Sequence, residues 1–377
     1  MSGTLFAFSS HYYVGQPNGY GDALSVYAGR TGMWALRDRF GFLNRFSPYR
    51  LYEPHETFPG GGRADRLPDL MGARAEELVA RSRREERDLY LFVSGGVDST
   101  AMTIALLEAA GEDRSRLHVI GTRHSEREYP AFMDFLRSLK DLDMREAPPC
   151  VGLAAAQDEA MRTGYAVTGW GADQLFGSIV NQMYPTEHYH SDWRGWLKGE
   201  DDAVQQLEAA FAHYGLPVKT FGEFAWFMNF ACKYDYVKHT DTLLSGNVTG
   251  RMIPFYDTPE FQAWSVSNFD MLHRLPQTRA ACYKRPLKEY IFAFNGDRQY
   301  LWGKGKEGSW GRLEDGDGED ASRHPVMAVA MESPDSARVE RTGEYLREGV
   351  DARTPDDELK RGMLRSYLKD TEGRFQA

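Results

Sequence analysis

The stretch Leu89-Tyr-Leu-Phe-Val-Ser-Gly-Gly-Val-Asp-Ser-Thr100 decides the fold. Residues 89–93 form an unbroken apolar run of aromatic and branched side chains, which is typical of a strand buried on both faces. Two glycines follow, and then 101–110, a run of good helix formers that is closed by Gly111. A glycine loop between a strand and a helix N-terminus can bring backbone N–H groups close to an anion. We therefore expect a phosphate-binding site at this loop.

The loop is not a Walker A loop, because it lacks the G-x-x-x-x-G-K-[ST] spacing. Instead it carries two hydroxyls, Ser94 and Ser99, and an acid, Asp98. An acid would repel phosphates unless a cation lay between them, so Asp98 predicts Mg²⁺ held by few protein ligands and several phosphate oxygens. The alternative is an ordinary glycine turn before a helix, with Asp98 and Ser99 as helix caps.

A second stretch has the same character. Residues 166–177, Ala-Val-Thr-Gly-Trp-Gly-Ala-Asp-Gln-Leu-Phe-Gly, begin as a short strand and continue as a glycine turn with a new acid, Asp173. A strand, helix and strand in succession predict parallel pairing through a right-handed crossover. Ligands of such sheets bind at the carboxyl ends of the strands, where both stretches are expected to lie. The alternative for Asp173 alone is a helix N-cap.

Both stretches resemble known motifs. Residues 94–99 match in full the S-G-G-x-D-S pattern of the PP-loop ATP pyrophosphatases, and 169–177 resembles the G-x-G-x-D-E-L-F-G segment of the asparagine synthetase and β-lactam synthetase group. The resemblance implies an α/β fold with a doubly wound parallel sheet of the adenine nucleotide α-hydrolase type. It also implies ATP and Mg²⁺ as cofactors, with Asp98 and Asp173 as the metal ligands. The cofactor-binding residues that it implies are Ser94, Gly95, Gly96, Asp98, Ser99, Gly121, Gly169 and Gly171.

Lysines near the end of the resemblance supply the catalytic candidates. The stretch Tyr283-Lys-Arg-Pro-Leu-Lys-Glu-Tyr290 resembles the family's K-x-x-L-R helix, and 302–308 resembles a later R-x-K-x-G loop. A lysine beside the phosphates can stabilise negative charge that develops on the α-phosphate or the acyl oxygen. We expect Lys306 to take this role, with Lys304 close to it. The alternative is that both are solvated loop lysines.

Four positions depart from the family pattern. Trp170 and Gln174 stand where acidic residues are usual. In 251–257, which resembles the family's R-x-P-F-L-D segment, Met252 occupies the arginine position, and Gly250 falls where relatives often place a substrate-binding glutamate. The absence of this glutamate leaves the usual substrate in doubt.

The chain divides into three regions. Residues 1–65 hold short apolar segments at 5–8, 24–28 and 33–36, whose spacing predicts small strands in a reduced N-terminal β-rich region. Because residue 2 is Ser2 and no cysteine precedes Cys150, we do not expect a functional glutaminase lobe. Residues 66–312 form the synthetase domain, and 313–377 an acidic linker with two C-terminal helices.

The synthetase region alternates helices and strands. Spacing of apolar residues predicts an amphipathic helix over 67–84, a strand over 117–121 and helices over 130–139 and 153–162. The part from 179 to about 306 is helix-like and strongly aromatic, and core packing is expected to account for most of its rings. The C-terminal helices are predicted at 335–348 and 355–369.

Composition sets limits on the class of protein. The 377 residues carry a formal charge of −10, which disfavours a nucleic-acid substrate. Three scattered cysteines predict neither a zinc site nor a disulfide framework. The N-terminus has no signal-peptide pattern and no run suits a membrane span, so we expect a cytoplasmic enzyme without a membrane partner.

The function that these expectations favour is an ATP-dependent ligase that forms amides. A small-molecule carboxylate would be adenylated with release of pyrophosphate, and an amine or ammonia would then displace AMP. One alternative is a PP-loop enzyme that adenylates a nucleobase carbonyl for amination or thiolation. Another is a non-catalytic ATP-binding scaffold. The identity of both substrates and the formation of a homodimer stay open.

Overall fold

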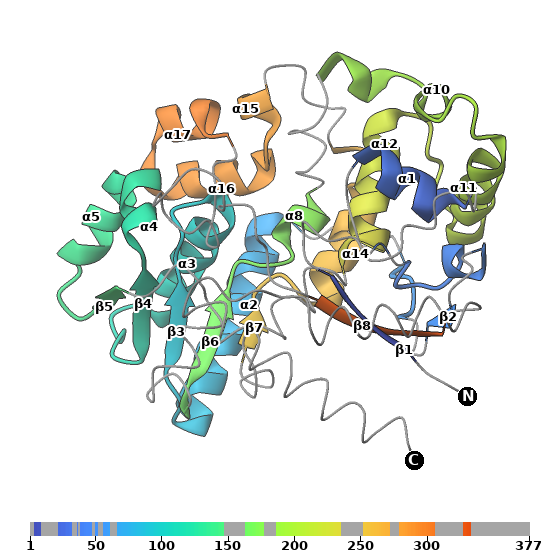
Figure 1. The fold of residues 1–377 in the computed structure, drawn as a ribbon. Coiled ribbons are helices and arrows are strands. Elements are labelled where there is room, and N and C mark those ends of the chain that lie inside the picture. The colour runs from blue at the N-terminus through green and yellow to red at the C-terminus, as the bar shows by residue number, and fades with distance from the viewer. Residues whose placement is uncertain are drawn as a thin grey trace, which may run out of the picture.

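The computed structural model describes the central part of the chain and short pieces of both ends (Figure 1). The described residues are 4–8, 22–31, 36, 38–46, 50–51, 56–60, 66–146, 163–176, 186–234, 252–271, 279–305 and 327–332. Several expectations fall outside them, namely the segment 33–35, the helix 153–162, Gly250, Arg251, Lys306, the acidic linker and both C-terminal helices.

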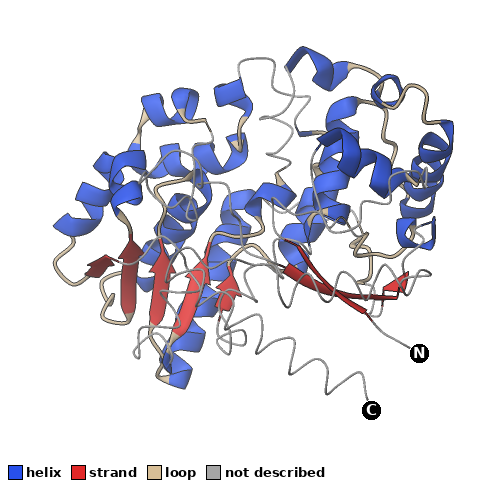
Figure 2. Ribbon diagram, viewed as in Figure 1, coloured by secondary structure: helices blue, strands red, loops and turns tan. Residues whose placement is uncertain are grey.

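A five-stranded parallel sheet forms the centre of the fold (Figure 2). Its order is β5 (Asp143–Glu146), β4 (Leu117–Gly121), β3 (Leu89–Phe92), β6 (Tyr165–Thr168) and β7 (Met252–Pro254). The strands predicted in the two motifs and at 117–121 are thereby confirmed, and so is an α/β fold. Every neighbouring pair is parallel.

The strand order reverses next to β3. The chain runs outward from β3 to β4 and β5, and then returns to place β6 on the other side of β3. Leu89 lies opposite both Leu117 and Tyr165, so the three strands begin at the same level. The carboxyl ends of β3 and β6 therefore flank the point of reversal, which is the position of ligand sites in open α/β sheets.

Helix α3 (Val97–Ala110) lies between two other helices, α2 (Leu67–Glu85) and α16 (Arg285–Asn295). The buried residues of α2 recur at three- and four-residue spacing, as its amphipathic pattern predicts. Almost every side chain of α3 is buried. The sequence placed the start of this helix at 101, but it begins at Val97, so Asp98 and Ser99 lie in its first turn.

The aromatic part of the chain forms a helical half beside the sheet (Figure 1). It contains α10 (Trp193–Trp196), α11 (Asp201–Tyr214), α12 (Phe221–Phe227), the π-helical turn Met228–Cys232 and α14 (Pro259–Ser267). Rings from different elements meet in its core, as where Trp193 and Phe224 stack with centroids 5.5 Å apart. The expectation that most of these rings serve core packing is confirmed, since Phe221, Phe224, Trp226, Phe227, Phe230 and Tyr234 are buried.

The prediction for 24–28 is wrong. This segment belongs to a helix, α1 (Ala23–Thr31), and not to a strand. Ala23, Leu24 and Tyr27 are buried, and the Tyr27 ring meets Trp196 and Phe224, both with centroids 5.6 Å away. Leu24 and Tyr27, three positions apart, share one face of a helix but would lie on opposite faces of a strand, so the helical core selects the helix.

The expected strand near 5–8 is present as β1 (Thr4–Phe8), with an unexpected partner. It pairs antiparallel with β8 (Met327–Glu332), which also pairs with β2 (Arg50–Leu51). The sequence had assigned the region of β8 to a linker and helices. The N-terminal region is therefore joined to the C-terminal one in a three-stranded sheet.

The other described elements are short. They are η1 (Leu43–Phe46), α4 (Arg123–Glu128), α5 (Pro130–Ser138), α8 (Ala172–Leu175), η2 (Thr186–His190), α15 (Arg279–Cys282) and α17 (Arg298–Gly303). Cys232 and Cys282 are buried thiols, as expected. No helix among the described residues has both the length and the apolar character that crossing a membrane requires.

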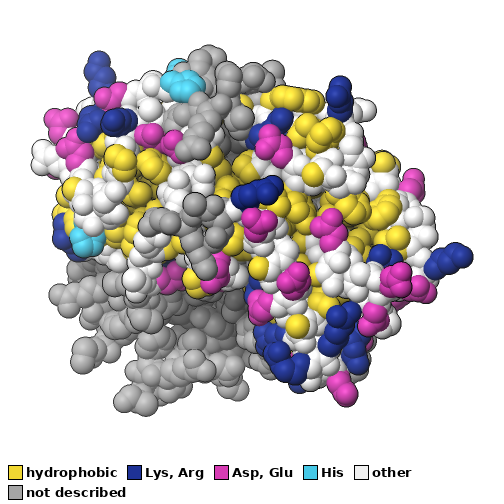
Figure 3. Space-filling view, turned by 180° about the vertical axis from the view of Figure 1, so that it is seen from behind, with side chains coloured by type: hydrophobic (Ala, Val, Ile, Leu, Met, Phe, Trp, Pro, Cys, Tyr) yellow, Lys and Arg dark blue, Asp and Glu magenta, His cyan; other side chains and the backbone are white. Residues whose placement is uncertain are grey.

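On the face in Figure 3, acidic and basic side chains are interspersed.

Candidate functional site

The loop between β3 and α3 is built around Gly95. This residue has φ +80°, and a Cβ placed on it would lie 2.9 Å from the Ser125 carbonyl oxygen. Only glycine suits this conformation and this close approach. The hydroxyls of the loop fix its shape, because the Ser94 N–H donates to Ser99 Oγ at 3.0 Å and the Gly96 N–H donates to Ser94 Oγ at 3.2 Å. The loop turns tightly into the N-terminus of α3, where the helix dipole favours an anion.

Gly169 brings the second motif against the first. A Cβ on Gly169 would lie 2.8 Å from the Ser99 amide nitrogen and 3.0 Å from the Asp98 carbonyl carbon. The turn after β6 therefore packs directly on the first turn of α3. Gly171 follows with φ +89° and precedes α8, which carries Asp173. The structure thus brings together the two acids that the sequence places 75 positions apart (173 − 98 = 75).

Lys284 joins these two acids. Its ammonium contacts Asp98 Oδ2, and its distance to Asp173 Oδ1 is 2.5 Å. The Lys284 side chain is 1% exposed, and the carboxylate side chains are 23% and 25% exposed. Burial lowers the pKa of Lys284, but the charges of Asp173 and Asp98 outweigh burial and raise that pKa well above its usual value. Lys284 is therefore a permanent cation between two acids.

The backbone at Lys284 is unusual. Lys284 has φ +45° at the junction of α15 and α16, a left-handed conformation that is uncommon outside glycine. Such conformations persist where the surrounding structure holds them, often at functional sites. Lys284 stands at the first position of the K-x-x-L-R pattern, for which no role was predicted. That match was the signal from which its place was predictable.

Other side chains hold the backbone of both acids. Tyr256 donates to the Asp98 carbonyl oxygen at 2.9 Å, and Asn229 Nδ2 donates to the Asp173 carbonyl oxygen at 2.6 Å. Asn229 belongs to the π-helical turn, which sequence reasoning treated as part of an aromatic core. Tyr256 stands at the leucine position of the segment that resembles R-x-P-F-L-D, where no role was predicted for it, and Asn229 stands in no motif.

Lys304 lies near the glycine loop with its charge paired. Its ammonium lies 3.0 Å from Glu128 Oε1, and the two side chains are 5% and 3% exposed. Glu128 lines the loop, since a Cβ on Gly96 would lie 3.2 Å from Glu128 Oε1. Tyr300, on the same helix end as Lys304, donates to the Gly95 carbonyl oxygen at 3.3 Å. Lys306, the first choice for the catalytic lysine, lies outside the described residues.

Gly121 lies at the end of β4 and contacts the loop only indirectly. A Cβ on Gly121 would lie 3.1 Å from Met133 Cε, and the next residue, Thr122, caps α4 together with Ser125. The Ser125 hydroxyl in turn donates to the Val93 carbonyl oxygen at 2.6 Å, just before the loop. Gly121 therefore lies at the carboxyl edge of the sheet, near the start of the loop.

Asp98 and Asp173 are the residues that could hold a magnesium ion between them. Asp98 and Asp173 lie close enough to contact one ammonium, and among the described residues no group of three or more His, Cys, Asp or Glu side chains is arranged to hold a metal. Mg²⁺ is typically bound by one or two carboxylates together with substrate phosphates and water. Two carboxylates beside an anion-binding loop are such a set.

Comparison of the chain with known protein families and with curated proteins finds no match.

Proposed function

We propose that this protein is an ATP-dependent ligase that adenylates a carboxylate and transfers the acyl group to an amine, as the asparagine synthetase-like PP-loop enzymes do. One observation carries the proposal. Asp98 and Asp173, from the helices that follow the two strands beside the reversal of strand order, meet at Lys284 next to a glycine loop at a helix N-terminus. A phosphate-binding loop with two acids and a lysine suits a nucleoside triphosphate. The sheet would be doubly wound around this site.

The chemistry proceeds in two steps. An oxygen of the substrate carboxylate attacks the α-phosphorus of ATP, the bond to the β-phosphate breaks, and pyrophosphate leaves. The amine then attacks the acyl carbon, AMP leaves with the bonding electrons, and the amine loses a proton. When bound, Mg²⁺ supplies charge neutralisation for the phosphates.

The residues of this chain have separate tasks in the proposal. The loop from Ser94 to Ser99 binds the departing pyrophosphate through its N–H groups and hydroxyls. Asp98 and Asp173 would hold the metal, and Lys284 keeps the two acids together and offers positive charge to the phosphates. A fixed charge of this kind needs no reorganisation during the reaction, which is why it stabilises the transition state strongly.

Lys304 supports the loop in this proposal. Its ammonium pairs with Glu128, the side chain that lies against Gly95 and Gly96. Because the charge is balanced by Glu128, we assign Lys304 to holding the loop and keep Lys306 as the candidate for stabilising charge on the acyl oxygen.

The test is identification of the nucleotide products. The protein is incubated with Mg-ATP and a fractionated small-molecule extract, and the products are separated by chromatography and identified by phosphorus NMR. We expect AMP and pyrophosphate with at least one fraction. Asp98→Asn removes one charge of the carboxylate pair and is expected to abolish both products. Asp141→Asn, at an exposed turn before β5, is the matched control and is expected to behave as wild type.

Two results would overturn the ligase. Formation of ADP and phosphate would indicate chemistry at the γ-phosphate. Absence of products from all fractions, together with tight ATP binding, would support a nucleotide-binding scaffold instead.

A further inference from the structure

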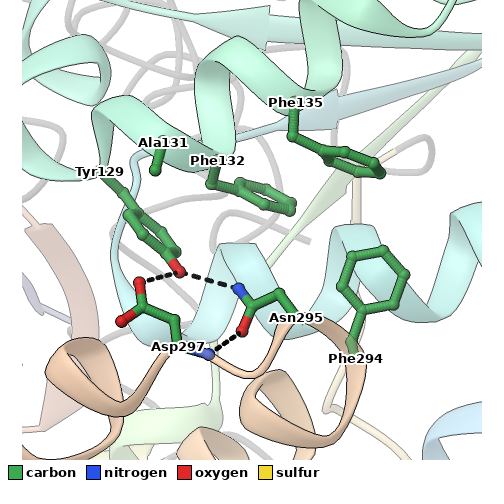
Figure 4. A pocket seen from close by; sticks show the side chains of 7 residues that line it. All are labelled: Tyr129, Ala131, Phe132, Phe135, Phe294, Asn295 and Asp297. Atoms are coloured by element: carbon green, nitrogen blue, oxygen red, sulfur yellow. Dashed lines mark hydrogen bonds between the residues drawn. The ribbon is translucent and has the colours of Figure 1, made fainter.

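A pocket of about 320 Å³ lies outside the candidate active site, between the α4–α5 segment and the junction of α16 and α17 (Figure 4). Its volume is in the range of small-molecule sites. Seven residues line it, Tyr129, Ala131, Phe132, Phe135, Phe294, Asn295 and Asp297. The first four come from the end of α4 and from α5, and the others from the end of α16 and the turn that follows it.

The apolar wall of this pocket is a row of aromatic rings. Phe132 stacks on Tyr129 with centroids 5.7 Å apart and on Phe135 with centroids 6.0 Å apart. Phe294 meets Phe135 edge to face at 5.5 Å and is 37% exposed, which is high for a large apolar side chain. Aromatic faces carry negative potential, so a row of them attracts cations as well as apolar groups.

The polar edge of the pocket consists of Tyr129, Asn295 and Asp297. The Tyr129 hydroxyl donates to Asp297 Oδ2 at 2.9 Å and accepts from Asn295 Nδ2 at 2.8 Å, and the Asp297 N–H donates to Asn295 Oδ1 at 3.0 Å (Figure 4). Burial, and then the bond to Asp297, raises the pKa of Tyr129 above its usual value, so the phenol stays protonated and its hydrogen is committed to Asp297.

The charge of this edge is negative and lacks a counterion in the described part of the chain. Asp297 accepts hydrogen bonds from Tyr129 and from the Tyr300 N–H, yet no ion pair joins it to any described residue. A carboxylate oxygen has room for more than one donor. The edge therefore offers negative charge and acceptor capacity to a bound molecule.

We propose that this pocket binds a small organic cation, an ammonium or amidinium group on an aromatic or branched apolar body. The charged group would lie at Asp297 and the apolar body against Phe132, Phe135 and Phe294. The pocket is separate from the nucleotide site, because the stacked rings of Tyr129 and Tyr300, 4.1 Å apart, stand between it and Gly95. The inference goes beyond the proposed ligase and does not depend on it.

The test uses 2-phenylethylammonium chloride as the probe and 2-phenylethanol as its neutral analogue. Each is titrated into the full chain without nucleotide, and binding is followed by NMR of the probe and by calorimetry. We expect saturable binding of the ammonium, with a dissociation constant on the order of millimolar for so small a molecule. The alcohol is expected to bind at least roughly fivefold more weakly than the ammonium, since it lacks the positive charge.

Three variants locate the site. Asp297→Asn retains a residue suited to cap α17, so the helix start is preserved while the charge is lost. We expect it to weaken ammonium binding roughly fivefold and to leave alcohol binding unchanged. Phe135→Ala is expected to weaken both ligands. Asp134→Asn, an exposed neighbour on α5 whose partner is Arg137, is the control and is expected to change neither.

The proposal is overturned if the ammonium does not bind saturably to wild type, or if the alcohol binds equally well. It is also overturned if Asp297→Asn, shown to be folded by circular dichroism, binds the ammonium as wild type does.

Discussion

At the scale of single residues, Lys284 determines the electrostatics of the candidate active site. Removing its charge leaves Asp98 and Asp173 facing each other without their shared cation. We expect Lys284→Met to lower the rate of AMP formation by about 10²-fold or more, which is the usual cost of losing one fixed charge at the transition state. The rate is measured at saturating Mg-ATP with the substrate fraction identified above.

Lys140→Met provides the control for this change, because Lys140 lies in an exposed turn. A Lys284→Met protein that is folded and loses less than about threefold in rate would show that the lysine is structural. Thermal unfolding of both variants separates loss of activity from loss of folded protein.

Substitution of Gly169 tests the contact between the two motifs. A methyl group in Gly169→Ala would meet the backbone of Asp98 and Ser99, which cannot move without shifting α3. We expect a loss of about 1–3 kcal/mol in the free energy of unfolding, as for other overpacked sites. Urea denaturation measures it.

Gly72→Ala is the matched control for Gly169→Ala. It lies within α2 with nothing within 4 Å of the added Cβ, and we expect it to stabilise the protein by about 0.5–1 kcal/mol. Equal effects of the two substitutions would contradict the close approach at Gly169.

At the scale of elements, the Glu128–Lys304 ion pair joins the end of α4 to the end of α17. Both side chains are almost fully buried, so breaking the pair leaves an uncompensated charge. We expect Glu128→Gln and Lys304→Met each to lower the free energy of unfolding by about 3 kcal/mol. The double variant is expected to recover most of that loss, because neither charge then remains.

Activity distinguishes the structural role of this pair from a catalytic one. If Lys304 only holds the loop, the double variant regains AMP formation along with stability. If the double variant is stable but inactive, Lys304 acts on the phosphates directly, contrary to the role assigned to it.

Lys288 connects three helices, and its titration makes the free energy of unfolding depend on pH. From α16, its buried ammonium donates to the Ala280 carbonyl oxygen in α15 and, at 3.2 Å, to the Lys304 carbonyl oxygen after α17. Burial, and then the charge of Arg285, lowers the pKa of Lys288 to about 8, although Cys282 acts in the opposite direction. The unfolded chain keeps its proton up to the ordinary value of 10.5.

The sign of the effect follows from these values. Between pH 8 and 10.5 the unfolded state binds more protons than the folded state at this position, so folding is favoured as pH rises. We expect the free energy of unfolding of wild type, relative to Lys288→Met, to be larger at about pH 9.5 than at about pH 7. Urea denaturation of both proteins at both pH values measures the difference, and an unchanged or falling difference would contradict the shift.

At the scale of the whole molecule, the sequence predicted the sheet better than its surroundings. The strands β3, β4 and β6 were predictable because short apolar runs between glycine turns leave few alternatives for a parallel core. The helix α1 was misread, since a five-residue apolar segment has no clear period until its partners Trp196 and Phe224 are known. The strand β8 lies in a short apolar run, 326–331, that was assigned to the linker region, and its pairing with β1 spans nearly the whole chain.

The candidate site was predictable to the same extent. Asp98, Asp173 and the loop glycines stand in local patterns, so their types and spacing pointed to them. Lys284 reaches Asp98 across 186 positions, and Asn229 reaches Asp173 across 56. A local pattern marked Lys284, but which side chains Lys284 and Asn229 reach depends on how the helices pack, which a local pattern does not contain.

The proposed function requires that Asp98, Asp173 and the glycine loop bind the phosphates of Mg-ATP. Calorimetric titration of ATP, with and without Mg²⁺, tests this claim without knowledge of the other substrates. We predict that Mg²⁺ tightens ATP binding to wild type, and that this gain is lost in Asp98→Asn and in Asp173→Asn but kept in Asp141→Asn. Failure of wild type to bind ATP, or binding that Mg²⁺ does not tighten, would contradict the account.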